Sequence, residues 1–172
     1  MKMQILTGVM VILGAAQIAN AADTITFTGT IDSNTCTVDV GGTTSSTITL
    51  PNVGAGSLTA AGKTAGATPF SINIKGCGTT ADDVAVRFVA HNPDDTNLGL
   101  DSSSTAANVS IQLLKGSAGS SSLDFTNGVA ETDKQTTASG TATYNMTAQY
   151  YAKGAVTAGT VMAVTDYEVI YP

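Results

Sequence analysis

A regular alternation of apolar and polar side chains is the feature of this sequence that most constrains its fold. Ile25, Phe27 and Ile31 alternate with threonines, and similar runs recur along the chain, whereas helical periodicity is hard to find. Every second residue of a β-strand lies on the same face of its sheet, so the pattern predicts half-buried strands. They are predicted at residues 24–31, 38–40, 47–50, 70–75, 84–89, 109–114, 144–150 and 167–171.

Turn-forming residues separate these predicted strands. Gly and Asn tolerate a positive φ and therefore tend to end a strand. About eight short strands with this spacing indicate an all-β sandwich in one domain, and the sequence shows no internal repeat. The turns are predicted at residues 41–42, 54–56, 92–95, 116–122, 127–128 and 158–159.

Residues 1–21 predict a secretory signal peptide. Lys2 provides a positive start, residues 5–18 are mostly apolar, and residues 19–21 (Ala-Asn-Ala) form a small-x-small cleavage site. The alternative is a membrane anchor, but the apolar stretch is too short and has the wrong flanks. Cleavage after residue 21 leaves a mature chain of 151 residues that begins at Ala22.

The mature chain is acidic. Removal of Lys2 leaves six Lys and Arg against thirteen Asp and Glu, a formal net charge of −7. A surface that binds phosphate needs clustered positive charge, so nucleic acid is not an expected partner. The acidity is more consistent with keeping an abundant exported product soluble.

Cys36 and Cys77 are the only cysteines of the chain. An exported chain with an even number of cysteines usually forms disulfides, and two thiols allow one pairing. The alternative is a metal or redox pair. It is less favoured because the sequence has no CxxC motif and a single histidine, His91, whereas zinc sites take four clustered ligands. No metal or cofactor is expected.

The sequence does not favour an enzyme. His91 precedes a predicted turn, and no GxSxG or HExxH motif supplies it with catalytic partners. The adjacent carboxylates at residues 82–83 and 94–95 are interpreted as solvated loop residues, because neighbours in a strand point to opposite faces. No catalytic residue is therefore predicted.

The mature chain opens directly on its most regular strand pattern. A terminal strand can complete its own sandwich, or it can be donated to another molecule. Gly29 favours donation, because a glycine inside a strand often marks close approach by another backbone. A sandwich that lacks a strand has a hydrophobic groove and unpaired edges, which a partner must cover.

Three segments, taken in order, resemble a known family. Residues 22–31 precede the first cysteine, and residues 70–77 form a strand-like run that ends at the second. Residues 144–159 are an aromatic, alanine and glycine run in which Gly159 lies fourteen residues from the end, and Tyr171 is penultimate. Over essentially the whole chain, this combination resembles the chaperone–usher fimbrial subunits of Gram-negative bacteria, the type 1-like pilins.

The resemblance implies an incomplete immunoglobulin-like β-sandwich that is completed by a donor strand from a neighbouring subunit. Residues 22–35 would form the donor-strand extension leading into the first strand, and residues 36–172 the pilin domain. A periplasmic chaperone would lend a strand until the extension of an identical or related subunit replaces it at an outer-membrane usher. The implied donor positions are Ile25, Phe27, Gly29 and Ile31, and the implied groove and chaperone contacts are Gly159, Tyr167, Val169, Tyr171 and Pro172.

The expected function is that of a structural subunit of a cell-surface fimbria that supports adhesion, reached by export through the periplasm. A small single-domain adhesin or tip adaptor is one alternative, although tip adhesins of this family carry an additional lectin domain for which 151 residues leave no room. A self-contained secreted binding module is the other. Such a module would fold as a monomer without a chaperone.

Overall fold

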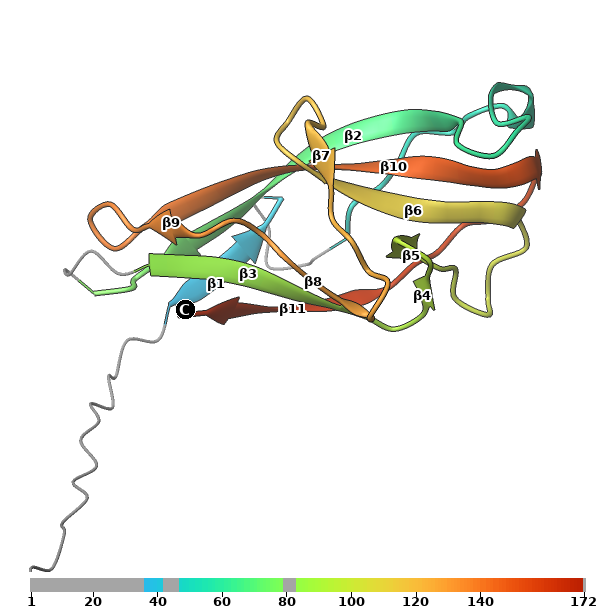
Figure 1. Ribbon diagram of the computed structural model, residues 1–172. Helices are drawn as coiled ribbons and strands as arrows, with labels where there is room; N and C mark the ends of the chain where they lie inside the picture. The colour runs from blue at the N-terminus through green and yellow to red at the C-terminus, as the bar shows by residue number, and fades with distance from the viewer. Residues whose placement is uncertain (1–35, 42–46, 79–82, 172) are drawn as a thin grey trace, which may run out of the picture. The chain divides into compact units, whose positions relative to one another are not determined.

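Seven strands of the described residues form the larger of two sheets (Figure 1). The computed structural model describes residues 36–41, 47–78 and 83–171. The main path of the larger sheet runs β1, β2, β10, β6, β5 and β4, and β7 pairs with β6; all of its pairs are antiparallel. The strands are β1 (Thr37–Val40), β2 (Thr64–Lys75), β4 (Pro93–Asp94), β5 (Asn97–Leu98), β6 (Ala107–Lys115), β7 (Ser121–Ser122) and β10 (Ala142–Thr157).

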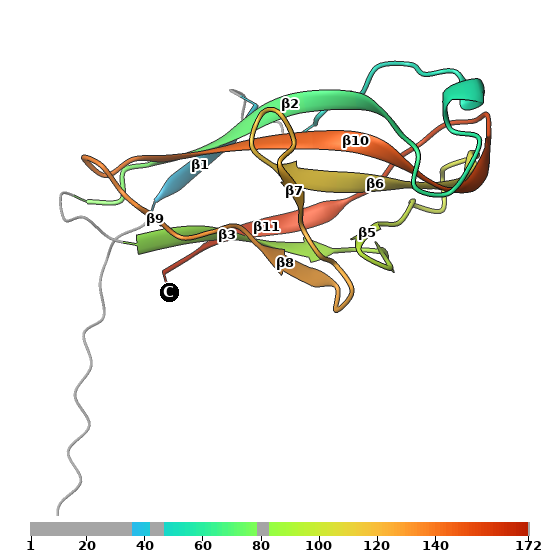
Figure 2. The same ribbon diagram turned by 45° about the horizontal axis from the view of Figure 1, so that its top comes forward.

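The smaller sheet faces the larger one and completes a two-layered sandwich (Figure 2). It contains β11 (Thr165–Ile170), β3 (Asp83–Ala90), β8 (Val129–Glu131) and β9 (Gln135–Thr136). Its order is β11, β3, β8, with β9 also paired to β3. β1 and β11 are therefore edge strands of the two sheets. The only helix in the described residues is the single 3-10 turn η1 (Ala55–Ser57).

Several predicted positions lie outside the described residues. They are the signal peptide at residues 1–21, the extension at residues 22–35 with its four donor positions, and Pro172. The described residues fall within one compact unit, Ser33–Pro172.

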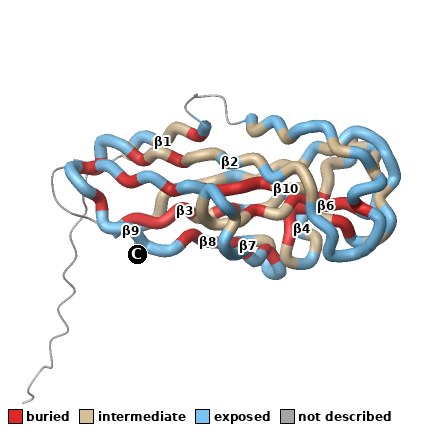
Figure 3. Tube along the Cα trace, turned by 90° about the horizontal axis from the view of Figure 1, so that it is seen from above, coloured by how far each residue is buried: buried red, intermediate tan, exposed pale blue. Residues whose placement is uncertain are grey.

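The alternation in the sequence accounts for the core between the sheets. On β3, Val84, Val86 and Phe88 are buried, whereas Val89 is 40% exposed on the outer face. Tyr144, Met146 and Ala148, at alternate positions of β10, are also buried. Figure 3 shows buried and exposed segments following one another along the strands. The predicted all-β sandwich is confirmed.

The structure corrects several predicted boundaries. Residues 47–50 alternate between exposed and half-buried positions, yet they belong to no strand of the described residues. The turn predicted at residues 92–95 is displaced, because β4 and β5 form a short hairpin around Asp95, which has a φ of 57°. Asp83 and Asp94, interpreted as loop residues, lie in β3 and β4. The strands β4 and β5 have only two residues each, which is too short for an alternation of apolar and polar residues to be recognised in the sequence.

A bulge shapes one end of the larger sheet. The pairing of β10 with β2 changes register between Ala148 and Tyr150. Gly66 lies at this point with a φ of +68°, and a Cβ atom there would approach the Tyr150 ring to 2.9 Å. A glycine is the residue that combines this backbone conformation with such close contact. Gly66 thereby makes room for the ring of Tyr150.

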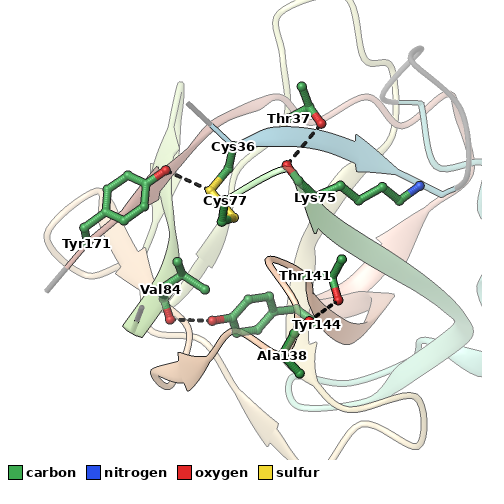
Figure 4. Close-up of a disulfide and its surroundings, with 9 residues drawn as sticks. All are labelled: Cys36, Thr37, Lys75, Cys77, Val84, Ala138, Thr141, Tyr144 and Tyr171. Atoms are coloured by element: carbon green, nitrogen blue, oxygen red, sulfur yellow. Dashed lines mark hydrogen bonds between the residues drawn. A yellow bond between two sulfur atoms is a disulfide. The ribbon is translucent and has the colours of Figure 1, made fainter. Parts of the chain in front are cut away.

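A disulfide and two tyrosine hydroxyl bonds lie near the start of β1, and the two hydroxyl bonds join the two sheets (Figure 4). The predicted disulfide is present and links Cys36, just before β1, to Cys77, just after β2. The hydroxyl of Tyr171, which follows β11, donates to Cys36 Sγ at 2.9 Å. The buried hydroxyl of Tyr144 on β10 donates to the carbonyl oxygen of Val84 on β3 at 2.6 Å. Burial raises the pKa of the Tyr144 hydroxyl, so it remains a donor at neutral pH.

We expect the substitution Tyr144→Phe to lower the free energy of unfolding by about 1–3 kcal/mol, because it leaves the buried Val84 carbonyl without its donor. Urea unfolding of the two proteins under identical conditions measures the difference. Tyr151→Phe is the matched control: Tyr151 is only half-buried, and its substitution should change the free energy by less than about 0.5 kcal/mol. If both variants lost the same free energy of unfolding, the hydrogen bond from Tyr144 to Val84 would make no measurable contribution to stability.

Candidate functional site

An apolar groove of about 930 Å³ runs along the side of the sandwich. Its floor consists of core side chains from both sheets. One wall, called here the first wall, is the segment 47–50. The other, called the second wall, is the segment 156–165, which runs from the end of β10 to the start of β11. The floor residues include Ile72, Phe88, Leu98, Ile111 and Leu113.

The first wall turns alternate side chains toward the core. Ile48 and Leu50 are half-buried and pack against it, while Thr47 and Thr49 are exposed. The second wall behaves similarly, since Val161 and Ala163 are half-buried against the same core. The two walls thus border one hydrophobic surface that neither of them covers.

The backbone of the second wall is paired along one edge. The carbonyl oxygens of Thr160, Met162 and Val164 accept hydrogen bonds from backbone N–H groups of residues 91–106. By contrast, within the described part of the chain no hydrogen bond uses the backbone of the intervening residues at 161 and 163. Free N–H and C=O groups along an extended segment are a template for pairing with another strand.

No charged side chain lines this groove among the described residues. Its polar lining is mainly threonine, at residues 47, 49, 157, 160 and 165. An apolar floor with an uncharged hydroxyl rim suits an extended segment that alternates apolar residues with threonine or serine. It offers nothing to a phosphate or to a cation.

The described residues contain no group of three or more potential metal-binding side chains. His91 lies at the surface, where its Nε2 atom is 3.1 Å from Asp166 Oδ2. Nearby, the pKa of Asp101 is lowered, mainly because the backbone N–H of Ser103 donates to its carboxylate. These side chains orient a surface loop and form no nucleophile–base arrangement.

The structure places the predicted groove residues in two groups. Gly159 and Tyr167 line the groove. Val169 packs against the core further along β11, and Tyr171 lies beside the disulfide, 51% exposed. Tyr167 and Gly159 therefore share a surface from which Tyr171 is separate, while Pro172 lies outside the described residues.

Sequence reasoning missed most of the walls and floor. The alternation at residues 47–50 predicts a half-buried strand and gives no sign that this segment borders a groove. No signal marked residues 161–164, because the run Val-Met-Ala-Val is apolar throughout and has no period of two. Tyr150 follows Tyr144, Met146 and Ala148 at alternate positions of β10, but nothing in the sequence marks it as a residue that lines a groove.

A two-layered sandwich with an unpaired wall beside an apolar groove defines a class of protein, the incomplete immunoglobulin-like domain that takes up a strand. Comparison with known proteins places the chain within that class. The family model described as "Fimbrial protein" matches residues 25–172. The chain therefore belongs to the fimbrial protein family, whose members are structural subunits of bacterial surface fimbriae.

Individual relatives agree with this assignment. The chain is 38% identical over 169 residues to the major fimbrial subunit SMF-1 of Stenotrophomonas maltophilia (strain K279a), covering 92% of this chain and 99% of that protein. It is 36% identical over 182 residues to the F17 fimbrial protein of Escherichia coli, covering 99% and 98%. Among solved structures, a chain of a chaperone–usher pilus has a TM-score of 0.62 at 20% identity, covering 92% of this chain and all of that one.

Family membership confirms the predicted class of function, a structural fimbrial subunit that reaches the cell surface through the periplasm. Subunits of this family assemble into polymers with other pilins. In the described residues, no helix has the length and hydrophobicity needed to cross a membrane.

We expect Gly159→Ala to destabilise the second wall. A Cβ atom at this position would meet the backbone nitrogen of Ala106 and would lie 2.5 Å from the carbonyl carbon of Thr105. Backbone atoms cannot move aside as a flexible side chain can, so the unfolding free energy should fall by about 1–3 kcal/mol. Thermal unfolding measures the change.

The matched control is Gly154→Ala, also in the chain leading to the second wall. A Cβ atom there comes no closer than 3.9 Å to Asn108 Cγ, an ordinary contact. This variant should unfold within a few degrees of the wild type. If the two variants melted together, the close approach at Gly159 would have no energetic consequence.

Proposed function

We propose that the groove accepts the N-terminal extension of another subunit, and that repeated insertion builds the fimbria. The occupant is the segment 22–31 of a second copy of this chain, or the equivalent segment of a related pilin. The observation that carries the proposal is the apolar groove, which has no charged lining residue in the described part of the chain and is bordered by backbone groups of Val161 and Ala163 that make no hydrogen bond there.

The chemistry of the extension suits such a groove. Ile25, Phe27 and Ile31 fall on one face of an extended segment, and threonines occupy most of the other. Burying each large apolar side chain contributes roughly 1.5–3 kcal/mol, and pairing with the unpaired wall adds backbone hydrogen bonds. Because the donor and the groove are different surfaces, the contact is head-to-tail, and the polymer grows without closing.

A chaperone and an usher complete the proposal. An apolar groove beside an unpaired edge is prone to aggregation, so the subunit needs a temporary partner in the periplasm. A strand from the chaperone would occupy the groove, and its basic residues would hold the carboxylate of Pro172. At the outer-membrane usher, the extension of the incoming subunit would replace the chaperone strand. The role proposed for this chain is structural rather than catalytic.

The test compares donor variants of the full mature chain, co-expressed with its chaperone and usher. Phe27→Asp should abolish SDS-resistant polymers, because it places a charge against an uncharged apolar surface. Thr28→Asp is the matched control, since its side chain lies on the opposite face of the extension and should leave assembly largely intact.

Two results would count against donation. Equal assembly of both variants would mean that the face carrying Phe27 does not enter a groove. A mature chain that folds without a chaperone as a stable monomer, and forms no ladder, would favour the self-contained binding module instead.

A further inference from the structure

The backbone hydrogen bonds that hold the second wall in place are supplemented by side-chain hydroxyls. Four residues supply them: Ser104 and Thr105 from the loop before β6, Thr157 from the end of β10, and Thr160 from the wall itself. These four residues are called here the hydroxyl seam. Three of them are exposed and one is half-buried, so the seam lies outside the hydrophobic core.

The centre of the seam is a reciprocal pair between Thr105 and Thr160. The backbone N–H of Thr160 donates to Thr105 Oγ1 at 2.8 Å, and the backbone N–H of Thr105 donates to Thr160 Oγ1 at 3.1 Å. The two hydroxyl oxygens are themselves 3.1 Å apart and hydrogen-bonded. The side-chain oxygen of each threonine thus accepts a hydrogen bond from the backbone N–H of the other. In a regular β-sheet, a backbone carbonyl oxygen of the neighbouring strand would be the acceptor.

The seam continues on either side of this pair. The backbone N–H of Met162 donates to Ser104 Oγ at 2.9 Å, and the same hydroxyl donates to the Met162 carbonyl oxygen at 3.2 Å. In the other direction, the backbone N–H of Ala107 donates to Thr157 Oγ1 at 2.9 Å. The wall is therefore fixed at residues 157, 160 and 162.

Fixing residues 160 and 162 also fixes what the residues between them do. When the backbone groups of Thr160 and Met162 face the seam, those of Val161 and Ala163 face the other edge, and their side chains face the core. If the wall shifted by one residue, Val161 and Ala163 would face the seam, and Thr160 and Met162 would face the open edge. This follows because side chains and backbone groups alternate in direction along an extended segment with a period of two. The seam, together with the backbone bonds to the carbonyl oxygens of Thr160 and Met162, thus fixes which edge of the wall an incoming strand meets.

We propose that the hydroxyl seam is a positioning element that sets the register of the inserted strand. This inference rests on the proposed function, since it concerns how the same groove selects its donor. With the seam intact, a donor in the right register places its apolar residues on the groove floor. A donor shifted by one residue meets the same backbone groups with threonines pointing inward.

The experiment uses the full mature chain in complex with its periplasmic chaperone. Two fluorescent peptides compete with the chaperone: one has the sequence of residues 22–31, and the other exchanges each apolar or glycine residue with the threonine before it. The uptake of each peptide into an SDS-resistant complex is measured over time. The ratio of the two uptake rates reports register selection.

The seam variant combines Ser104→Ala with Thr105→Val, which removes the acceptors for the N–H groups of Thr160 and Met162. We expect the rate ratio to fall by about tenfold or more, since the four hydrogen bonds made by these two hydroxyls are lost. Thr143→Val removes one exposed hydroxyl bond on the outer face of the larger sheet and should leave the ratio unchanged. The single variant Thr105→Ser keeps a hydroxyl at residue 105 and leaves Ser104 unchanged. Its uptake-rate ratio should therefore equal that of the wild type.

The outcomes separate the two proposals. If wild-type protein takes up neither peptide, donor insertion itself is wrong, and the register inference falls with it. If wild-type protein selects the native peptide and the seam variant selects it equally well, the seam does not position the strand, while donor insertion stands. If the double variant yields no chaperone complex, the single Thr160→Val variant provides the same comparison.

Discussion

An edge of the sandwich that no strand of the described residues covers is the constraint on which the rest of this structure depends. The larger sheet ends at β1 and the smaller at β11, and the core between them is open along the groove. Hydrophobic floor residues lie there together with backbone groups of Val161 and Ala163 that have no hydrogen bond among the described residues. An extended segment is needed both to bury the floor residues and to form hydrogen bonds with these backbone groups. A single added strand can therefore do both.

The other bonds of the domain keep this groove open and in shape. The disulfide links the neighbouring strands β1 and β2 of the larger sheet, and the hydroxyls of Tyr144 and Tyr171 connect this end to the smaller sheet, away from the second wall. The hydroxyl seam holds the wall itself, and the close approach at Gly159 lets it lie against the loop before β6. Stability is therefore built around the groove, so that the free energy of filling it remains available for assembly.

Much of the fold could be predicted because the long strands have one buried face and show the alternation plainly, as β3 does from Val84 to Val89. The short strands β4, β5 and β7 escape prediction because two residues define no period. Residues 47–50 show why alternation alone is incomplete: it reports which face is buried, but not whether the edge has a partner. The second wall could not be predicted, because its conformation depends on hydrogen bonds between residues 55 positions apart.

The most direct measurement is the structure of the assembled fimbria by electron cryomicroscopy, traced well enough to assign residues 25–31 to a particular subunit. Strand donation predicts that these residues of one subunit lie in the groove of the next, paired with the backbone of Val161 and Ala163 and with Phe27 on the groove floor. If they lay in the groove of their own subunit, or if the groove held no strand, donation between subunits would be contradicted.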